Sequence, residues 1–133
     1  MLGEKIAEAT GKILVRRVLP SEVGPKMETS FQANGSLLGT EVRETGTYTA
    51  AIRPNGTIFG EGQGVIISKD GEMATWQGQG VGTIKPGGTV SYRGAVFYQS
   101  SSSKFSRLNS IACVFEYEAD PEGNTRSQLW EWK

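Results

Sequence analysis

The sequence predicts a single all-β domain: a closed, antiparallel, up-and-down β-barrel of about eight long strands with little or no helix. Two observations point to this fold class. Turn-forming residues recur along the chain, and the segments between them are rich in Val, Ile, Thr, Tyr and Phe that alternate with a period of two. The turn signals are Asn34-Gly35, Pro54-Asn55-Gly56, Lys69-Asp70-Gly71, Pro86-Gly87-Gly88, residues 100–104 and residues 120–124.

The lengths of these segments are a third observation, and they favour closure of the sheet. Most segments run for about ten residues or more, which is longer than a typical sandwich strand. None shows the period of a crossover helix, and only residues 3–10 are compatible with a short helix. Long up-and-down strands leave two exposed edges unless the sheet closes, so a barrel is the expected architecture.

The composition indicates one domain, residues 1–133, and argues against several functions. Fourteen Lys and Arg residues balance fourteen Asp and Glu residues, which disfavours nucleic acid or an anionic membrane as a partner. The chain has no histidine and one cysteine, so we expect no metal site, no cofactor and no disulfide. It has no basic leader with an apolar run and no membrane-spanning apolar stretch, so we expect a cytoplasmic protein.

The turn residues predict the register of four consecutive strands. Pro54 lacks the N–H that a residue flanking a two-residue turn must donate, so residues 54–56 are expected to form a three-residue loop with Gly56 in the left-handed conformation. Residue 52 then faces residue 58. The same reasoning at the next two turns makes residue 64 face 76 and residue 84 face 90.

In this register, the even-numbered residues between 46 and 98 share one face that carries no charge inside a strand. The odd-numbered residues are mostly polar, so the even face is predicted to be the barrel interior. Each large aromatic residue lies opposite a bare glycine, an arrangement in which the ring fills the space above the glycine. The predicted pairs are Tyr48 with Gly62, Trp76 with Gly64, and Tyr92 with Gly82.

The remaining strands are predicted from shorter patterns. The first strand has an apolar inward face on which Arg17 also falls. Its apolar residues are Ile13, Val15 and Leu19. The inward residues of the next strand are Met27, Thr29, Phe31 and Ala33, and those of a later strand are Ile111, Cys113, Phe115 and Tyr117.

The interior face supplies the candidate binding residues. Its large aromatic side chains are Tyr48, Trp76, Tyr92 and Tyr98. Glu44 and Arg17 join them if no bulge intervenes in their strands, and the two would form a small polar cluster in an apolar cavity. The alternatives for these two charges are a structural ion pair at the barrel mouth, or a bulge that turns one of them outward.

Three other features have structural explanations. The Gly-x-Gly-x-Gly runs at residues 60–64 and 78–82 do not open a helix, as a phosphate-binding loop must. Cys113 lies in an apolar strand with no histidine to activate it, so we expect a buried structural thiol. The serines at 100–103 are expected to form a flexible loop.

Several short motifs carry a resemblance to known barrels. They are Arg17-Val18-Leu19, Gly46-Thr47-Tyr48, the glycine run 60–64, the segment 71–76 ending at Trp76, and Gly78-Gln79-Gly80. Over about residues 40–118, their spacing resembles uncharacterised prokaryotic relatives of the allene-oxide-cyclase-like and lipocalin-like eight-stranded β-barrels. This resemblance implies a barrel with an apolar lumen. The polar site residues of allene oxide cyclases have no counterpart here, so their activity is not implied.

Three functions are compatible with these observations. The first is the binding of a small apolar or amphipathic ligand in the barrel interior. The second is a cofactor-free isomerase or cyclase in which Glu44 or Arg17 polarises the substrate. The third is a packed structural barrel that acts through oligomerisation, for example as a homodimer. Its contact would use apolar residues predicted on the outer face, namely Phe59, Val65, Ile67, Val81 and Phe97.

Overall fold

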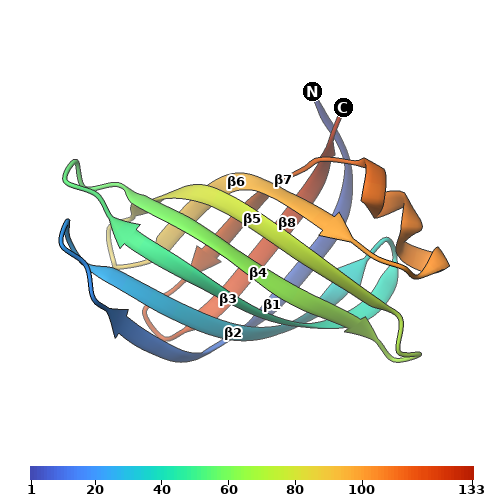
Figure 1. Cartoon of the computed structure of the whole chain (residues 1–133), viewed down its shortest axis with the longest axis horizontal. Helices are drawn as coiled ribbons and strands as arrows, with labels where there is room; N and C mark the ends of the chain where they lie inside the picture. The colour runs from blue at the N-terminus through green and yellow to red at the C-terminus, as the bar shows by residue number, and fades with distance from the viewer.

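The computed structural model describes all residues 1–133 and shows one antiparallel sheet closed into a barrel, as the sequence predicts (Figure 1). The strands follow one another around the barrel in chain order, and β1 closes it by pairing with β8. Their bounds are β1 Leu2–Leu19, β2 Lys26–Leu37, β3 Thr40–Ile52, β4 Ile58–Ser68, β5 Met73–Ile84, β6 Val90–Gln99, β7 Cys113–Ala119 and β8 Asn124–Trp132. Residues 3–10 therefore belong to a strand.

A single 3-10 helix, η1 (Ser103–Ser110), joins β6 to β7 and lies at one end of the barrel (Figure 1). The Ser102 hydroxyl accepts a hydrogen bond from the backbone N–H of Lys104 and so caps the start of the helix. Phe105 and Leu108 are three residues apart, which places both on one face of a 3-10 helix, and both are fully buried. The serines at 100–103, which were expected to form a flexible loop, instead lead into an ordered helix that fills this end of the barrel.

The predicted register of the central strands is confirmed. Ile52 pairs with Ile58, Gly64 with Trp76, and Ile84 with Val90. The three aromatic–glycine pairs are also present, because neither the β3–β4 ladder nor the two that follow contain a register shift. Gly56 has a φ of +87°, as the three-residue loop requires.

The predicted turn at Asn34-Gly35 is wrong, because both residues lie inside β2. The chain turns instead at Leu38-Gly39, whose φ values of +49° and +78° fit a two-residue hairpin turn with both central residues left-handed. Position 35 is a glycine for a reason other than a turn. A Cβ there would lie 1.9 Å from the carbonyl oxygen of Glu8, so only glycine allows β1 to approach this closely.

A β-bulge in β1 overturns the predicted facing of this strand. The ladder with β2 shifts between Ile13 and Val15, so Leu14 is the extra residue and the residues beyond it change face. Val15, Arg17 and Leu19, all expected to point inward, take outward register positions. The Arg17 Nε is 3.6 Å from the Glu28 Oε1, and the Arg17 side chain is 66% exposed.

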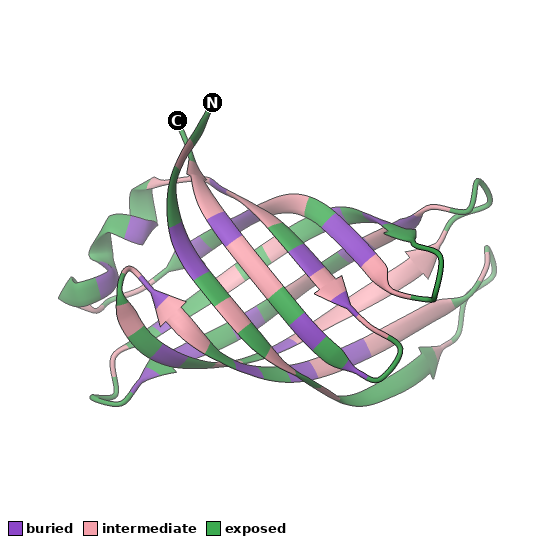
Figure 2. Cartoon of the chain, turned by 180° about the vertical axis from the view of Figure 1, so that it is seen from behind, coloured by how far each residue is buried: buried purple, intermediate pink, exposed green.

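The interior is filled by two clusters of side chains, one toward each end of the barrel. The cluster at the η1 end consists of Ile6, Ala7, Leu37, Val42, Ile66, Ala74, Val96, Tyr98, Phe105, Leu108, Cys113 and Leu129. The cluster at the other end consists of Phe31, Ala33, Ile58, Tyr92, Tyr117 and Ala119. Figure 2 shows buried and exposed residues alternating along the strands, as expected when successive side chains point into and out of the barrel. Ile84, at the end of β5, is an exception and is exposed at the rim.

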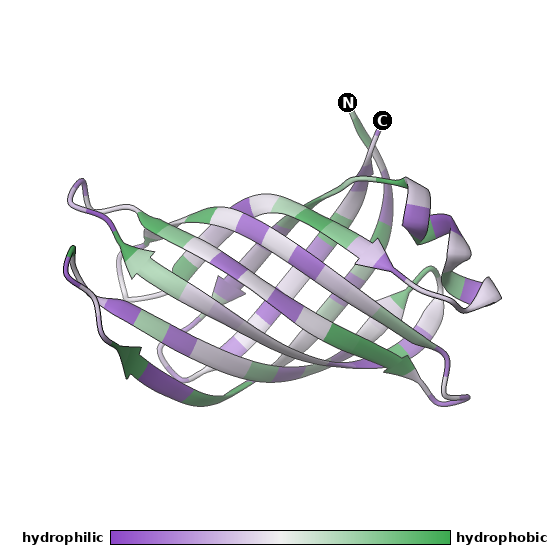
Figure 3. Cartoon of the chain, viewed as in Figure 1, coloured by the Kyte–Doolittle hydropathy of each residue, from purple (hydrophilic) through white to green (hydrophobic).

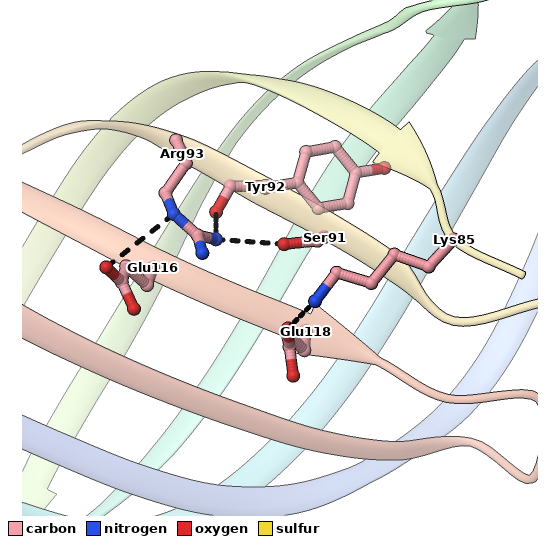
Figure 4. Close-up of polar contacts among 6 residues, drawn as sticks. All are labelled: Lys85, Ser91, Tyr92, Arg93, Glu116 and Glu118. Atoms are coloured by element: carbon pink, nitrogen blue, oxygen red, sulfur yellow. Dashed lines mark hydrogen bonds and ion pairs between the residues drawn. The ribbon is translucent and has the colours of Figure 1, made fainter.

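The outer wall carries ion pairs and scattered apolar residues. Figure 4 shows two of the pairs: Arg93 Nε lies 3.6 Å from Glu116 Oε2, and Lys85 Nζ lies 2.7 Å from Glu118 Oε2. Exposed pairs of this kind contribute little to stability. Four of the five apolar residues predicted on the outer wall are exposed there: Val65, Ile67, Val81 and Phe97. Figure 3 shows the most hydrophobic part of β4 toward its C-terminal end.

The fifth of these residues, Phe59, is half-buried. The guanidinium carbon of Arg53 lies 5.7 Å from the centre of its ring, within the range of a cation–π contact. The chain contains no helix with the length and apolar character needed to cross a lipid bilayer.

Candidate ligand-binding site

A cavity of about 100 Å³ lies inside the barrel between the two clusters. Glu44 and Tyr48 from β3, Trp76 from β5, and Tyr92 and Tyr98 from β6 all line it. Five of the six residues predicted for the site are thus brought together. Trp76 and Tyr92 face the same lumen, which confirms the even-face prediction on which the site depends.

Arg17 does not belong to the site, because the bulge in β1 turns it outward. The predicted Glu44–Arg17 pair is therefore absent, and Arg17 pairs with Glu28 instead. The neighbouring Arg16 takes the register position beside Thr29, two strands from Tyr48. Its charge is close enough to Tyr48 to oppose part of the rise in that hydroxyl's pKa caused by burial.

Four aromatic rings form one wall of the site. Phe31, Tyr48, Tyr92 and Tyr117 pack with ring centroids 5.5–6.1 Å apart and with tilted or edge-to-face orientations. The Tyr117 hydroxyl donates to the Tyr48 hydroxyl over 3.2 Å. Burial raises the pKa of all three tyrosines, so their hydroxyls are neutral and act as hydrogen-bonding groups.

Trp76 lies over a glycine of the neighbouring β4 and a glycine of β3, one strand further on. A Cβ at Gly64 would be 2.3 Å from the Trp76 Nε1, and one at Gly46 would be 3.0 Å from the Cζ2. The two glycines therefore create the space that the indole ring occupies. The buried Nε1–H has no acceptor in hydrogen-bonding geometry.

Glu44 is the only acidic residue of the cavity lining that is not exposed. It reaches the inner face because β3 pairs with β2 and β4 without a bulge. Burial raises the pKa of the carboxyl to about 7, and the nearby indole N–H of Trp76 offsets a small part of that rise. The indole is close enough to influence the charge, yet it does not satisfy the geometry of a hydrogen bond. Glu44 takes part in none of the eight ion pairs of the chain.

Tyr98 and Cys113 lie in the cluster at the η1 end and complete the titratable groups around Glu44. Burial, followed by the nearby Glu44 charge, holds the pKa of Tyr98 well above its usual value. Burial raises the pKa of the Cys113 thiol to about 11, so the thiolate is scarce at neutral pH. This supports the interpretation of Cys113 as a structural residue.

The sequence analysis omitted Phe31 and Tyr117 from the site, although it placed both on inward faces. Their importance comes from their contact with Tyr48, which joins β2 and β7 to the central strands. The period-two pattern of each strand shows which of its residues face inward. The missing information was which of its residues lie at the same height in the barrel as Tyr48 and Tyr92.

Comparisons with known proteins support the fold. No protein-family model matches the chain, and no curated protein matches it. The chain is similar to the crystal structure of a protein of unknown function from Clostridium acetobutylicum ATCC 824, with a TM-score of 0.84 and 15% identity over 96% of each chain.

Two further solved structures are similar over almost their whole length. One is a conserved protein of unknown function from Rhodopseudomonas palustris, with a TM-score of 0.80 and 13% identity over 99% of each chain. The other is a β-barrel-like protein from Acinetobacter baumannii AYE, with a TM-score of 0.84 and 13% identity, covering 100% of this chain and 96% of the other. These likenesses support an eight-stranded barrel and do not assign the chain to the allene-oxide-cyclase-like or lipocalin-like families.

Proposed function

We propose that this protein binds a small amphipathic molecule inside its barrel. The observation that carries the proposal is the presence of two polar groups on one cavity: the Trp76 Nε1–H, which is buried without an acceptor, and the Glu44 carboxyl, which lines the cavity without a cationic partner. Buried polar groups without partners are unfavourable in a protein interior. A ligand with an apolar body and one polar group would satisfy them and fill the space between the clusters.

The size of the cavity limits the ligand. A cavity of roughly 150 Å³ lined by apolar side chains holds one benzene molecule. The present cavity, at about 100 Å³, therefore suits a molecule smaller than benzene, of about four or five non-hydrogen atoms. A fatty-acid chain does not fit without rearrangement of the tyrosines.

The resemblance to lipocalin-like and allene-oxide-cyclase-like barrels adds support, because those barrels hold their ligands in the lumen. In this protein the lumen is narrowed at one end by η1 and at the other by the cluster that contains Tyr92 and Tyr117. The proposal takes the interior location of the ligand from the resemblance, and takes the ligand's size from the cavity.

Isobutanol is a suitable first probe, because it combines four carbons with one hydroxyl. We expect millimolar isobutanol to raise the melting temperature and to shift one of the three indole N–H signals in a ¹⁵N NMR spectrum, that of Trp76. Trp76→Phe should weaken the stabilisation, because it removes the donor. Trp130→Phe changes an indole in β8 outside the cavity lining and should leave the response intact.

A response that persists unchanged in Trp76→Phe would place the ligand elsewhere on the protein. If isobutanol and other molecules of this size, whether neutral or charged, all leave the melting temperature and the indole signals unchanged, the proposal is wrong. In that case, the barrel interior is a packed core with a void.

A second candidate is a cofactor-free acid–base enzyme, and one observation favours it. A carboxyl whose pKa is about 7, in an apolar cavity, can remove a proton from a carbon next to a carbonyl and return it. We expect the protein to exchange the α-protons of butanone in D₂O faster than its Glu44→Gln variant does. Equal exchange rates would contradict catalysis and leave the binding proposal intact.

A further inference from the structure

We propose that the ligand of this cavity is a small organic cation, such as a protonated aliphatic amine, whose ammonium group pairs with the Glu44 carboxylate. This inference rests on the proposed function and narrows the chemical class of its ligand. It is argued from the balance of charge in the lumen, from the aromatic lining and from the volume of the cavity.

The lumen contains an acidic group without a counter-charge. Every Lys and Arg that forms an ion pair does so with a carboxylate other than Glu44, and all of these Lys and Arg side chains are exposed. A carboxylate buried without a cation is unfavourable, whereas one paired with a cation is tolerated. A cationic ligand would supply the missing charge, which the chain itself does not provide.

The lining of the cavity also favours a cation. Trp76, Tyr98 and Tyr48 line it together with Glu44. The faces of aromatic rings carry negative potential and attract ammonium groups, most strongly where water is excluded. The apolar part of a small amine would meet aliphatic lining residues such as Ile66, Val96 and Leu129.

The other charge classes suit this site less well. An anionic ligand would bring a second negative charge next to Glu44, and like charges in a low-dielectric interior repel strongly. A neutral ligand supplies no counter-charge to the ionised Glu44 carboxylate, so it suits the protonated form of the carboxyl. The two classes therefore differ from a cation in how their affinity depends on pH.

Between pH 5 and 9, Glu44 is the only lumen group whose ionisation changes. Burial raises the pKa of each tyrosine around it and of Cys113, so these groups stay protonated in that range. The remaining charged neighbours lie on exposed positions of β1 and β4. The groups that face or flank Glu44 are Tyr48, Tyr92, Tyr98, Cys113 and Tyr117, with Arg16, Glu8 and Glu61 on the exposed positions.

Three molecules with one isobutyl or isopropyl skeleton distinguish the classes: isobutylammonium, isobutanol and isobutyrate. We expect calorimetry at pH 8 to show at least tenfold tighter binding of isobutylammonium than of isobutanol, and no binding of isobutyrate. Glu44→Gln preserves the size of the side chain and removes its charge, so the preference for the ammonium should disappear. Glu44→Asp keeps the charge and should keep the preference.

The wild-type protein provides a test that needs no substitution. Isobutylammonium affinity should increase about tenfold from pH 5 to pH 6 and level off above about pH 7, because the ammonium pairs only with the ionised carboxyl. Binding at pH 6 should release a proton, which calorimetry detects as a dependence on the buffer's ionisation enthalpy.

The possible outcomes separate this inference from the proposed function. Equal affinity for isobutanol and isobutylammonium, an ammonium preference that survives Glu44→Gln, or an ammonium affinity that is constant from pH 5 to pH 8 would overturn the cation inference. In each of these cases the lumen still binds a small molecule, and the proposed function stands. If none of the three molecules binds, the proposed function and the cation inference both fail.

Discussion

The two ends of the barrel interior are filled by different kinds of side chain. At the η1 end, Phe105, Leu108 and Cys113 have no exposed surface and make no side-chain hydrogen bond. At the other end, Tyr92 and Tyr117 are also buried, yet their rings carry hydroxyls, and the Tyr117 hydroxyl bonds to another tyrosine. The candidate site lies between a mostly aliphatic cluster, in which Tyr98 supplies the one hydroxyl, and a cluster that contains two tyrosine hydroxyls.

This difference indicates a division of roles within one small core. The η1 end is packed almost entirely with apolar side chains and is suited to stabilising the barrel. The tyrosine end presents neutral hydroxyls and ring edges, which are suited to contacts with a ligand. Glu44 and Trp76 lie near the boundary, where a cavity is present and where the polar groups lack partners.

The largest effect is expected from substitution at the η1 end. Phe105→Ala should lower the free energy of unfolding by about 3–5 kcal/mol, because it removes a fully buried ring and leaves a cavity. Tyr117→Phe, at the opposite end, removes only the hydroxyl that donates to Tyr48 and should lower it by about 1 kcal/mol. Equilibrium unfolding in urea measures both values, and equal losses would contradict the division of roles.

Glu44 is expected to make stability depend on pH. The pKa of its carboxyl is about 7 in the folded protein, against an ordinary value of 4.5, so the folded state holds the proton more tightly. Its burial therefore lowers stability increasingly as the pH rises from 4.5, by at most about 3 kcal/mol above pH 7. Below pH 4.5 this loss is absent.

Glu44→Gln removes that ionisation and provides the measurement. The free energy of unfolding of the variant minus that of the wild-type protein should be small near pH 4 and should grow to about 3 kcal/mol by pH 8. Urea unfolding of both proteins across this range gives the difference directly and cancels the contribution of the surface carboxylates. A difference that does not change with pH would show that the carboxyl is solvated.

The sequence predicted the central part of the barrel well because its turns constrain it chemically. Pro54 excludes the shortest hairpin, and Gly56 permits the left-handed residue of the next shortest. Once that turn is assigned, the alternation of side chains decides which residues face inward, and no bulge disturbs β3. The positions of Glu44 and Trp76 in the interior follow from this.

The rest of the site depended on features that no local pattern reveals. The bulge at Leu14 reverses the facing of Arg17, and it lies where β1 continues along β2 beyond the end of its ladder with β8. Asn34-Gly35 has the composition of a turn, yet Gly35 is required by the close approach of another strand. The cavity volume could not be predicted either, because it depends on how rings from different strands pack against one another.

The smallest effect is expected for Gly60→Ala, which is compared with Gly64→Ala on the same inward face of β4. Gly64→Ala would place a Cβ 2.3 Å from the Trp76 Nε1, so the indole ring must move. Such overpacking should lower the free energy of unfolding by about 1–3 kcal/mol. The intrinsic fluorescence of the protein should change, because Trp76 leaves its buried position.

Gly60→Ala is the matched control on the same face of the same strand. Its Cβ would lie 3.0 Å from the Cε1 of Tyr92, a contact that a shift of a few tenths of an ångström relieves. Alanine also restricts the unfolded chain more than glycine, which offsets part of the strain. The change in unfolding free energy should therefore be under about 1 kcal/mol, with unchanged tryptophan fluorescence. If Gly60→Ala is as damaging as Gly64→Ala, the space above Gly64 is not specific to the indole, and the arrangement of Trp76 beside Glu44 loses its structural explanation.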